Sequence, residues 1–417
     1  LSKMSGDATW DVIVIGMGIM GSSTAYFLSK YHGKRVLCLE QFDLGHSRGS
    51  SHGHTRILRK VYNEDHFTKI AMLSYPLWES VQAECGYRLY QNTGGLDWDS
   101  STPGISEKIT ERAKTLRRLG VACDEISGLE ASRKFPGLYL PEGSNVLYQP
   151  DSGVSFANKC VRAFQSLAAN AGATILENSP VSSIKSAKDS ITVTTENGKS
   201  FVTKKLVITP GGWLKPFLQK HFDITVHADV WKVGYWYWDS NGSNAYEASN
   251  GFPVFIDHSP VGFYYGTPAL EYPNLIKIGA HYPSTLDVTA SSRTFVPDPV
   301  LEAGTKEWVR KHFKLCDADK PALAETCLYT VTRNEEFLMD RLPSNPNIVV
   351  GGGFSGHGFK HSPMVGKMLA SLVLSDAPAA EAMAAAGQHA SSPALNLRPE
   401  DLKDFTFTFH TQYKARL

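Results

Sequence analysis

The 417-residue sequence predicts an α/β protein, in which a Rossmann-type nucleotide-binding domain carries an inserted β-rich domain. Three observations point to this fold class. A β-branched run near the start leads directly into a glycine-rich turn and a helical stretch, two later apolar runs also end in glycines, and segments rich in aromatic residues lie between those runs. At about 100 to 200 residues per domain, the chain is long enough for two or three domains.

The first unit reads as a complete βαβ motif. Residues 11–15, Asp-Val-Ile-Val-Ile, are typical of a buried strand. Three glycines in the G-x-G-x-x-G spacing follow: Gly16, Gly18 and Gly21. They permit a tight turn, close approach of backbone to a pyrophosphate, and packing of the helix on the strand. A second strand over 35–39 ends in Glu40, about 20 residues beyond the last glycine, where it can accept hydrogen bonds from a ribose.

Two later apolar runs are expected to return to the same sheet. Residues 205–209 lead into Pro-Gly-Gly-Trp, and residues 347–350 lead into three consecutive glycines. Junctions of this kind bring backbone close to a ligand at the carboxyl edge of a parallel sheet. The nucleotide-binding domain is therefore predicted to be discontinuous, with pieces at 8–88, 150–222 and 322–392.

The remaining segments predict a second, β-rich domain that holds the substrate. Strands of an antiparallel sheet are expected where aromatic and apolar residues alternate, at 231–238, 262–266 and 275–281. This domain is predicted over residues 89–149 and 223–321. The stretch 377–392, rich in Ala, Pro and Ser, is expected to form a surface helix or linker, and residues 393–417 a C-terminal tail.

Charge and composition exclude several classes of function. The formal net charge is only +1, so bulk electrostatics favour neither nucleic acid nor an anionic membrane as a partner. No run approaches the roughly 18 apolar residues of a membrane span, which predicts a soluble protein. The histidines show no spacing typical of a metal site, so no metal is expected.

Cysteine usage and the last residues bear on the compartment. The six cysteines lie far apart, without a C-x-x-C pair and without a secretory signal ahead of them, which predicts free thiols in a reducing compartment. Ala415, Arg416 and Leu417 have the small-basic-leucine form of a peroxisomal address. The peroxisome is therefore the predicted location, and a peroxisomal import receptor a predicted partner.

A basic loop follows the second predicted strand. Residues 46–59 contain three histidines and three arginines among glycines and serines, one of which is Ser51. Such crowding of basic side chains is costly unless an anionic or electron-rich ligand lies there. A solvated basic loop is the alternative, but the position directly after the strand that ends at Glu40 favours a ligand site.

This loop, the segment Cys327–Thr330 and the segment Gly353–Lys360 together resemble the monomeric sarcosine oxidase family of flavin amine oxidases, most closely its peroxisomal members. The resemblance extends over about residues 11–375. It implies FAD rather than NAD as the cofactor, and a glutathione-reductase-like fold of the D-amino-acid oxidase type. It also implies a monomer that acts on a small amino-acid substrate, with oxygen as the acceptor.

The resemblance assigns roles to individual residues. Cys327, in the C-x-Y-T motif, would be bonded through sulfur to the 8α-methyl group of FAD, although a free cysteine is more often part of a core. Arg59 and Lys360 would hold the substrate carboxylate, which needs cationic partners in a dry site; structural ion pairs are the alternative. Lys277, four residues before His281, would stabilise the anion formed as oxygen accepts an electron, unless it is a strand lysine facing solvent.

Further positions would border the cofactor or the amine. Arg56 and His52 would lie beside the flavin ring, where a cation stabilises the anionic reduced form. The side chains around the bound amine would be Tyr265, His281 and Tyr329. The remaining cofactor-binding positions are Gly16, Gly18, Gly21, Glu40, Ser51, Gly356 and Lys360. His54 is a departure, because bacterial members of the family carry an acid there.

The sequence thus predicts an FAD-dependent oxidase of secondary amino acids, with L-pipecolate or sarcosine as the substrate and an imine and hydrogen peroxide as products. Within the same family, N-methyltryptophan or a glycated amino acid is an alternative substrate. The nucleotide motif alone would equally fit an NAD-dependent dehydrogenase or a non-catalytic nucleotide-binding protein.

Overall fold

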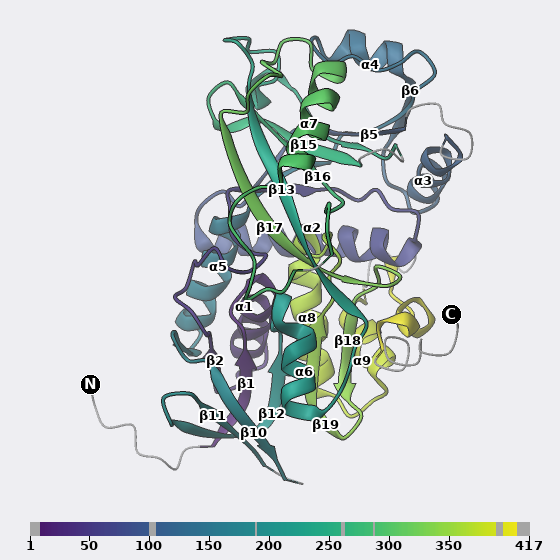
Figure 1. The fold of residues 1–417 in the computed structure, drawn as a ribbon. Coiled ribbons are helices and arrows are strands. Elements are labelled where there is room, and N and C mark those ends of the chain that lie inside the picture. Colours follow the sequence, from purple (N-terminus) through teal and green to yellow (C-terminus); the bar gives the residue numbers. More distant parts are fainter. Residues whose placement is uncertain are drawn as a thin grey trace, which may run out of the picture.

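The computed structural model describes residues 9–99, 106–187, 190–259, 263–286, 288–388 and 395–406. Figure 1 shows two regions stacked along the long axis of the molecule, a lower one around a mainly parallel sheet and an upper one around an antiparallel sheet. The predicted targeting residues Ala415, Arg416 and Leu417 lie outside the described residues.

The lower sheet contains the strands that the glycine motifs predict. Its eight strands are β1 Trp10–Ile15, β2 Val36–Leu39, β9 Thr174–Leu176, β10 Val181–Ser186, β11 Ile191–Thr195, β12 Ser200–Ile208, β18 Leu338–Leu342 and β19 Asn345–Gly352. The order β19-β12-β1-β2-β9 is parallel throughout, and β10, β11 and β18 extend it antiparallel. The strands predicted at 205–209 and 347–350 are confirmed, because β12 and β19 pair in parallel.

Helices cover both faces of this sheet because its central strands are apolar throughout. In β1, Val12 and Val14 point into one core while Ile13 and Ile15 point into the other, as the two-residue period of a strand requires. The first core lies beneath α1 Ile19–Tyr26, α2 Asp65–Cys85, α5 Ala157–Asn170 and α8 Ser362–Leu374. The second lies beneath α6 Leu214–Phe222.

The upper sheet also has eight strands: β5 Gly95–Asp99, β6 Asp124–Ser127, β7 Asn145–Gln149, β13 Ala228–Asp239, β14 Val254–Asp257, β15 Tyr264–Tyr272, β16 Leu275–Ala280 and β17 Leu323–Thr332. Their order is β17-β13-β16-β15-β14-β5-β7-β6, and only β14 and β5 pair in parallel. The strands predicted at 231–238 and 275–281 are confirmed as β13 and β16. The strand predicted at 262–266 corresponds to β15, and residue 262 lies outside the described residues.

The paired strands β13 and β17 connect the two regions. Figure 1 shows them crossing from the upper region toward the lower one, and their pairing places Val233 opposite Cys327. An aromatic core fills the upper region beneath α4 Gly128–Lys134 and α7 Pro299–His312. The β13–β17 ladder therefore carries Cys327 from the antiparallel sheet to the edge of the nucleotide-binding region.

A third, three-stranded sheet holds the basic loop in place. It consists of β3 Thr55–Leu58, β8 Gly153–Phe156 and β4 Tyr90–Asn92, with β3 and β4 both antiparallel to β8. β3 also lies against β15 of the upper sheet. Nearby, α3 Ser106–Arg118 packs its apolar side against β7. The second half of the basic loop is thus a strand wedged between the two main sheets.

Short helical turns complete the described chain, at Phe27–Tyr31, Gly211–Trp213, Ala248–Asn250, Phe359–His361 and Pro399–Phe405. The helix predicted within 377–392 is present as α9 Ala379–Ala386. It lies at the surface, with Glu381 and Ala385 exposed, while Ala382 and Met383 on its other side are buried against α8. The turn at Pro399–Phe405 adds Leu402 and Phe405 to the same core.

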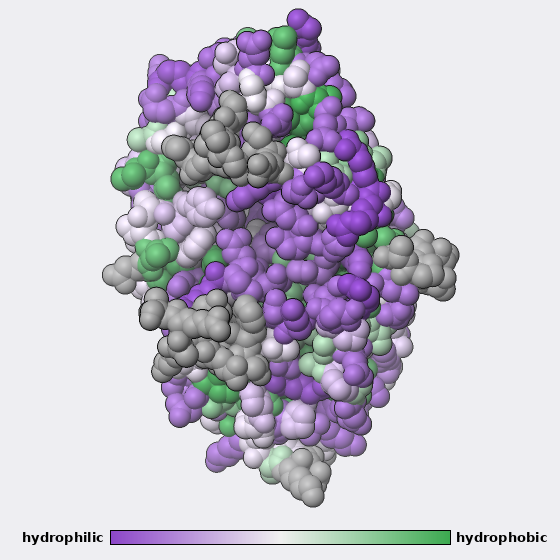
Figure 2. All heavy atoms as spheres, turned by 90° about the vertical axis from the view of Figure 1, so that its right-hand side faces the viewer, coloured by the Kyte–Doolittle hydropathy of each residue, from purple (hydrophilic) through white to green (hydrophobic). Residues whose placement is uncertain are grey.

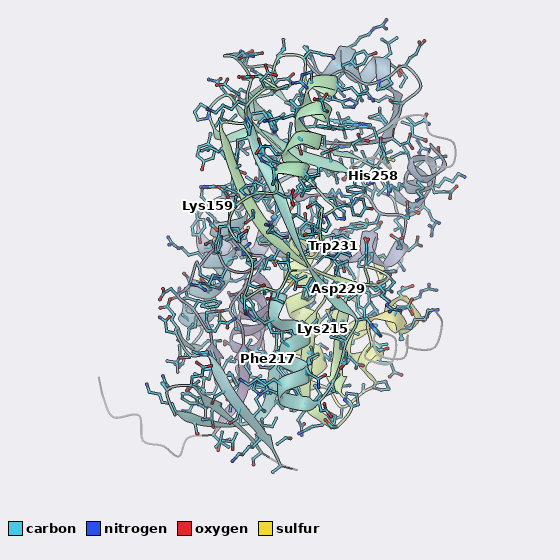
Figure 3. The ribbon with its side chains drawn as sticks, in the orientation of Figure 1. Lys159, Lys215, Phe217, Asp229, Trp231 and His258 are labelled. Carbon is cyan, nitrogen blue, oxygen red and sulfur yellow. The ribbon has the colours of Figure 1, made fainter. Side chains whose placement is uncertain are left out.

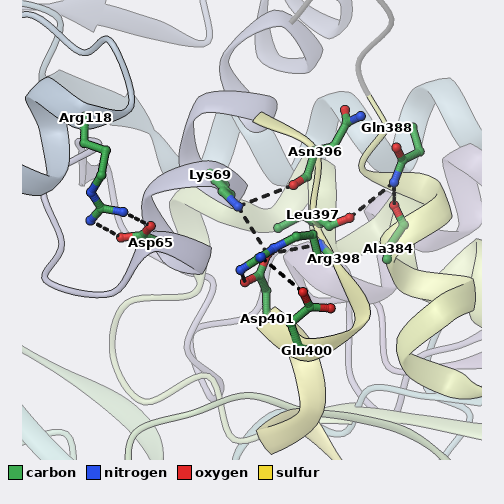
Figure 4. A network of polar contacts seen from close by, with 10 residues as sticks. All are labelled: Asp65, Lys69, Arg118, Ala384, Gln388, Asn396, Leu397, Arg398, Glu400 and Asp401. Carbon is green, nitrogen blue, oxygen red and sulfur yellow. Dashed lines mark hydrogen bonds and ion pairs between the residues drawn. The ribbon is translucent and has the colours of Figure 1, made fainter. Parts of the chain in front are cut away.

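A polar network fastens this C-terminal segment to α2. The Nζ of Lys69 lies 3.2 Å from Oδ2 of Asp401 and 3.4 Å from the carbonyl oxygen of Asn396 (Figure 4). Arg398 donates to Oδ1 of the same aspartate at 2.9 Å. The side chains of Lys69 and Asp401 are only 8% and 9% exposed, so this ion pair is part of the packed interior.

Figure 2 shows a largely hydrophilic face on which hydrophobic residues are scattered. No helix in the described part of the chain is long and apolar enough to cross a membrane. Over those same residues, no group of three or more His, Cys, Asp or Glu side chains is arranged to hold a metal ion. All six cysteines are described, and all are free.

Candidate active site

One cavity of about 1540 Å³ extends from the glycine turn of the lower sheet to the upper sheet. Three of its lining residues are labelled in Figure 3: Lys159 on α5, Phe217 on α6 in the lower half and His258 after β14 in the upper half. Every site residue predicted from the sequence, from Gly16 to Lys360, lines this cavity. Its position at the carboxyl ends of parallel strands is the usual place for a ligand in such a sheet.

The nucleotide end is shaped by glycines that could not be replaced without a clash. Gly16 has φ +90°, and a Cβ there would lie 2.4 Å from the carbonyl oxygen of Thr209. A Cβ on Gly21 would lie 1.8 Å from the carbonyl oxygen of Gly16. The backbone is therefore bare where the first turn of α1 begins, and a diphosphate can approach its N–H groups. This geometry fits the FAD implied by the motif.

Glu40 and Ser51 organise the same turn. The buried carboxylate of Glu40 accepts hydrogen bonds from the backbone N–H of Met17 at 2.8 Å and of Phe42 at 3.1 Å. The Oγ of Ser51 accepts a hydrogen bond from the N–H of Ile19 at 3.0 Å. Glu40 thus fixes the turn and also lines the cavity, where its carboxylate can accept a further hydrogen bond from a ribose hydroxyl.

Arg56 connects the basic loop to Cys327. Its Nη2 lies 3.7 Å from the Cys327 sulfur and donates to the carbonyl oxygens of Ser50 at 3.0 Å and His52 at 2.7 Å. Burial alone would lower the pKa of Arg56, but the neighbouring Cys327 and Tyr235 outweigh it and raise the pKa. The guanidinium is therefore a fixed positive charge beside the thiol.

His52 is close to the same cation and stays neutral. Burial lowers its pKa to about 3, and the charge of Arg56 acts in the same direction. Its Nε2 has no hydrogen-bond partner among the described residues. Of the two basic residues predicted beside the flavin ring, Arg56 is thus the cation, while His52 offers an unused ring nitrogen to a ligand in the cavity.

Lys277 forms a buried ion pair that the sequence does not predict. Its Nζ lies 3.2 Å from Oε1 of Glu271, and the two side chains are 6% and 2% exposed. The ammonium also donates to Oγ1 of Thr55 at 3.2 Å and lies 4.3 Å from the ring centre of Tyr235. The alternative that Lys277 is a strand lysine facing solvent is therefore wrong.

Arg59 lies at the upper end of the cavity, where a carboxylate already pairs with it. Its Nη1 donates to Oδ1 of Asp97 at 2.9 Å, and both side chains are buried. His258 lies 2.7 Å from the same oxygen through Nε2. Burial would raise the pKa of Asp97, but Arg59 and the hydrogen bond from His258 outweigh it and lower the pKa. Asp97 thus stays ionised and orients the guanidinium.

Lys360 lies close by and has no carboxylate partner in the part of the chain that the structure describes. Its Nζ donates to the hydroxyl of Tyr62 and to the carbonyl oxygen of His357, both at 2.9 Å. The ring of Tyr62 also lies under the guanidinium of Arg59, 4.9 Å away. Burial holds the pKa of Lys360 well below its usual value, and the charge of Arg59 lowers it further. An anion bound here would relieve both effects.

Aromatic side chains close the cavity between these charges and Cys327. The hydroxyl of Tyr329 donates to that of Tyr265 at 3.1 Å, and the ring of Tyr329 lies 5.5 Å from that of His281. Burial lowers the pKa of His281 to about 4, with Arg59 and Lys360 acting in the same direction. His281 is therefore a neutral wall residue within the field of both cations.

Sequence reasoning missed Asp97, His258, Tyr62 and Glu271. A signal existed for Asp97, because an acidic residue in the apolar strand β5 must be buried beside a partner. No comparable signal marked Glu271, since its partner is decided by how β15 and β16 pair. His54, noted as a departure from the family, does not line the main cavity but a small outer hollow of about 190 Å³.

Comparisons with known proteins agree with the motifs. The family model described as FAD dependent oxidoreductase matches residues 11–372. The chain is 36% identical to the peroxisomal sarcosine oxidase of Homo sapiens, over 88% of this chain and 93% of that protein. It is 32% identical to the monomeric sarcosine oxidase of a Bacillus species, over 88% and 92%.

Solved structures support the fold. NikD, an amino acid oxidase of nikkomycin biosynthesis, superposes with a TM-score of 0.77 at 22% identity, covering 94% of this chain and 98% of that one. L-proline dehydrogenase from P. horikoshii gives a TM-score of 0.74 at 21% identity, covering 88% and 93%. The predicted D-amino-acid oxidase type of fold is thereby confirmed. The chain belongs to the FAD-dependent oxidoreductase family and, within it, to the sarcosine oxidases, which makes it a flavoprotein oxidase acting on amine donors.

Proposed function

We propose that the protein oxidises small secondary amino acids, with L-pipecolate and sarcosine as the foremost substrates, and that oxygen is the electron acceptor. The substrate loses a hydride equivalent from the α-carbon region and a proton from nitrogen, which leaves an imine. Oxygen takes up two electrons and two protons and becomes hydrogen peroxide. Relatives named as monomeric and peroxisomal sarcosine oxidases support this proposal, and also a monomeric state.

The observation that carries the proposal is the distribution of charge in one cavity. Two cations, Arg59 and Lys360, lie at the upper end, and Arg56 and Lys277 lie near Cys327. An amino acid has one carboxylate to place, and the upper pair can receive it. The reacting carbon would then face the part of the cavity between the aromatic residues and Cys327.

Lys360 is the better anchor of the upper pair. Asp97 already occupies Nη1 of Arg59, whereas Lys360 contacts only neutral oxygens among the residues described. A carboxylate bound to both would share the guanidinium with Asp97 and supply the counter-charge that Lys360 lacks. Tyr265, Tyr329 and the neutral His281 would border the amine and keep water out.

The cofactor would be held covalently. FAD, when bound, supplies the acceptor for the hydride equivalent. Cys327 would carry it through a thioether, because its sulfur lies 3.7 Å from the guanidinium of Arg56 and the residue lines the cavity. The remaining cofactor-binding positions would line the site of the bound FAD: Gly16, Gly18, Gly21, Glu40, Ser51 and Gly356. The family match favours FAD over NAD, so the dehydrogenase alternative falls away.

The location would be the peroxisome. The human and mouse relatives carry that location in their names, and the basic tripeptide at Ala415, Arg416 and Leu417 has the form that an import receptor binds. An enzyme that releases hydrogen peroxide would suit that compartment.

The direct test is peroxide release by the purified yellow protein against sarcosine, L-pipecolate, L-proline and N-methyltryptophan, with glycine as the primary-amine control. We expect kcat/KM to be highest for L-pipecolate or sarcosine, and at least about tenfold lower for glycine, a difference of roughly 1.4 kcal/mol in transition-state binding. Preference for N-methyltryptophan would move the protein to the alternative substrate class. No peroxide with any of the four would refute the proposal.

A further inference from the structure

We propose that Glu271 is the positioning residue of the oxygen reaction: it fixes the ammonium of Lys277 at the Cys327 end of the cavity and keeps it charged. This inference rests on the proposed function and on the role that the family resemblance gives to Lys277, which is to stabilise the anion formed as oxygen accepts an electron. It assigns a role to a carboxylate that no sequence motif marks.

The contacts of Glu271 define that role. Oε1 accepts hydrogen bonds from Lys277, at 3.2 Å, and from the hydroxyl of Thr55. Oε2 accepts a hydrogen bond from the hydroxyl of Tyr237 at 2.5 Å. The carboxylate thus has three donors from three different strands, and Lys277 is the one cation among them. A carboxylate satisfied in this way has little freedom to move, and neither has the ammonium bound to it.

Strand pairing brings the two residues together. Lys277 in β16 lies opposite Tyr237 in β13 and opposite Thr267 in β15. Between Thr267 and Tyr272 the register of β15 against β16 shifts, and Glu271 lies within that irregular stretch. An irregularity of this kind re-aims side chains. It accounts for a glutamate that turns toward the buried lysine six positions later in the chain.

Electrostatics explain why the pair is needed. Burial lowers the pKa of Lys277, the charge of Arg56 lowers it further, and Glu271 opposes both. Burial would raise the pKa of Glu271, but Lys277, Thr55 and Tyr237 outweigh it and lower the pKa. Other titratable groups face the pair from every side: His52, Arg56, Tyr235, Tyr237, Glu325 and Cys327 on the cavity side, and Tyr272, His54 and Lys159 beside Glu271. Without Glu271, the buried amine would hold its proton less tightly.

Glu271 also forms part of the wall between two hollows. Lys277 lines the main cavity, and Glu271 lines the small outer hollow together with His54, Lys159 and Leu270. Replacing Glu271 with a small residue would join the two spaces and admit water. Glu271→Gln is therefore the informative change, because it removes the charge and keeps the volume.

The first test measures the lysine itself. In protein labelled with [ε-13C]lysine, the signal of Lys277 is identified by its absence from Lys277→Met. Its apparent pKa should fall by about one unit or more in Glu271→Gln. A titration unchanged from the wild type would overturn the proposal, whatever the activity of the variant.

The second test separates the half-reactions in a stopped-flow instrument. In Glu271→Gln, anaerobic reduction by substrate should stay within about threefold of the wild type, while reoxidation by oxygen should slow about tenfold or more. As the pH is raised, the reoxidation rate of the variant should begin to fall at a lower pH than that of the wild type. Combining the substitution with Lys277→Met should add nothing to the effect of Lys277→Met alone. Additive slowing, or an unchanged pH profile, would contradict the proposal.

Two further variants serve as controls. Glu325→Gln removes a half-buried carboxylate that accepts a hydrogen bond from Tyr235 at 2.5 Å and has no hydrogen bond to Lys277. Its charge raises the pKa of Lys277 less than that of Glu271 does, so this variant should slow reoxidation less than Glu271→Gln. Tyr237→Phe removes one hydrogen bond of Glu271 and keeps the ion pair, so it should slow reoxidation less than Glu271→Gln does. It is the variant to measure if Glu271→Gln fails to fold. If Lys277→Met itself leaves reoxidation at the wild-type rate, the proposed function of Lys277 fails. If Lys277→Met slows reoxidation and Glu271→Gln does not, only the present inference fails.

Discussion

The sulfur of Cys327 lies 3.7 Å from Nη2 of Arg56, and this contact joins residues separated by most of the chain. Arg56 is itself held by three backbone carbonyl groups of the basic loop, those of Ser50, His52 and Thr55, so its charge is held beside the thiol. A fixed cation therefore lies against the sulfur that we expect to carry the cofactor.

The first prediction concerns the flavin linkage. Acid precipitation of the wild-type protein should leave flavin absorbance in the pellet, and Cys327→Ser should release it into the supernatant. Arg56→Met should slow attachment, because it removes the guanidinium that lies 3.7 Å from the sulfur. Cys160→Ser is the matched control, since that thiol is also buried but is not among the residues that line the cavity. Wild-type colour in the supernatant would show that the linkage is absent.

The second prediction concerns the substrate carboxylate. Lys360→Met should weaken substrate binding about 10- to 100-fold while FAD stays bound, because a charge-assisted hydrogen bond contributes about 1.5 to 3 kcal/mol. Arg59→Ala should weaken binding similarly and should also lower the melting temperature, since Asp97 is left buried with one cation fewer. Anaerobic titration of the flavin spectrum measures the dissociation constant. Changes below twofold in both variants would refute the assignment.

The third prediction concerns Lys277. Removing its charge in Lys277→Met should leave anaerobic reduction within about tenfold of the wild type and slow reoxidation by two decades or more. At about 4 Å and an effective dielectric near 20, an ammonium stabilises a new anion by roughly 4 kcal/mol, equivalent to about a thousandfold in rate. Equal slowing of both half-reactions would place Lys277 among substrate or folding residues instead.

The fourth prediction concerns pH and the C-terminal anchor. Burial would raise the pKa of Asp401, but hydrogen bonds from Arg398 and Lys69 outweigh it and lower the pKa below its usual 3.8. Because the folded-state pKa is depressed, the stabilisation is fully present above the unfolded pKa and is lost as pH falls through the folded pKa. Hydrogen exchange of residues 395–406 should therefore accelerate only in acid.

In Asp401→Asn, hydrogen exchange of residues 395–406 should already be fast at neutral pH. The free energy of unfolding should fall by roughly 1 to 3 kcal/mol, since the buried Lys69 then lacks a counter-charge. The exposed pair of Lys114 and Glu111 is the matched control, and Glu111→Gln should change stability little. Equal hydrogen exchange in wild type and Asp401→Asn would mean that the ion pair does not anchor the segment.

The fifth prediction concerns location. Residues 414–417 placed at the C-terminus of a fluorescent reporter should direct it to structures that carry a peroxisomal marker. A reporter with Leu417→Ala is the control and should remain diffuse. A diffuse signal from both reporters would mean that the tripeptide match is accidental.

The sequence by itself determined the nucleotide-binding unit. The Gly16–Gly21 turn and the strands that lead into Thr209 and Gly351 are read from local patterns, because β-branched runs and glycines act on the few residues around them. Motif resemblance then identified Cys327, Arg59 and Lys360, and the structure places all three along one cavity. The roles of these residues and the domain boundaries stay predictions.

Tertiary structure alone decided the partners of the buried charges. Asp97 meets Arg59 because β5 and the chain after β3 converge, and Glu271 meets Lys277 because a register shift turns it inward. Likewise, only packing against α8 decides which side of α9 is buried. A buried charge must be paired, but which distant residue supplies the partner depends on how strands and helices pack in space, and local sequence carries no record of that geometry.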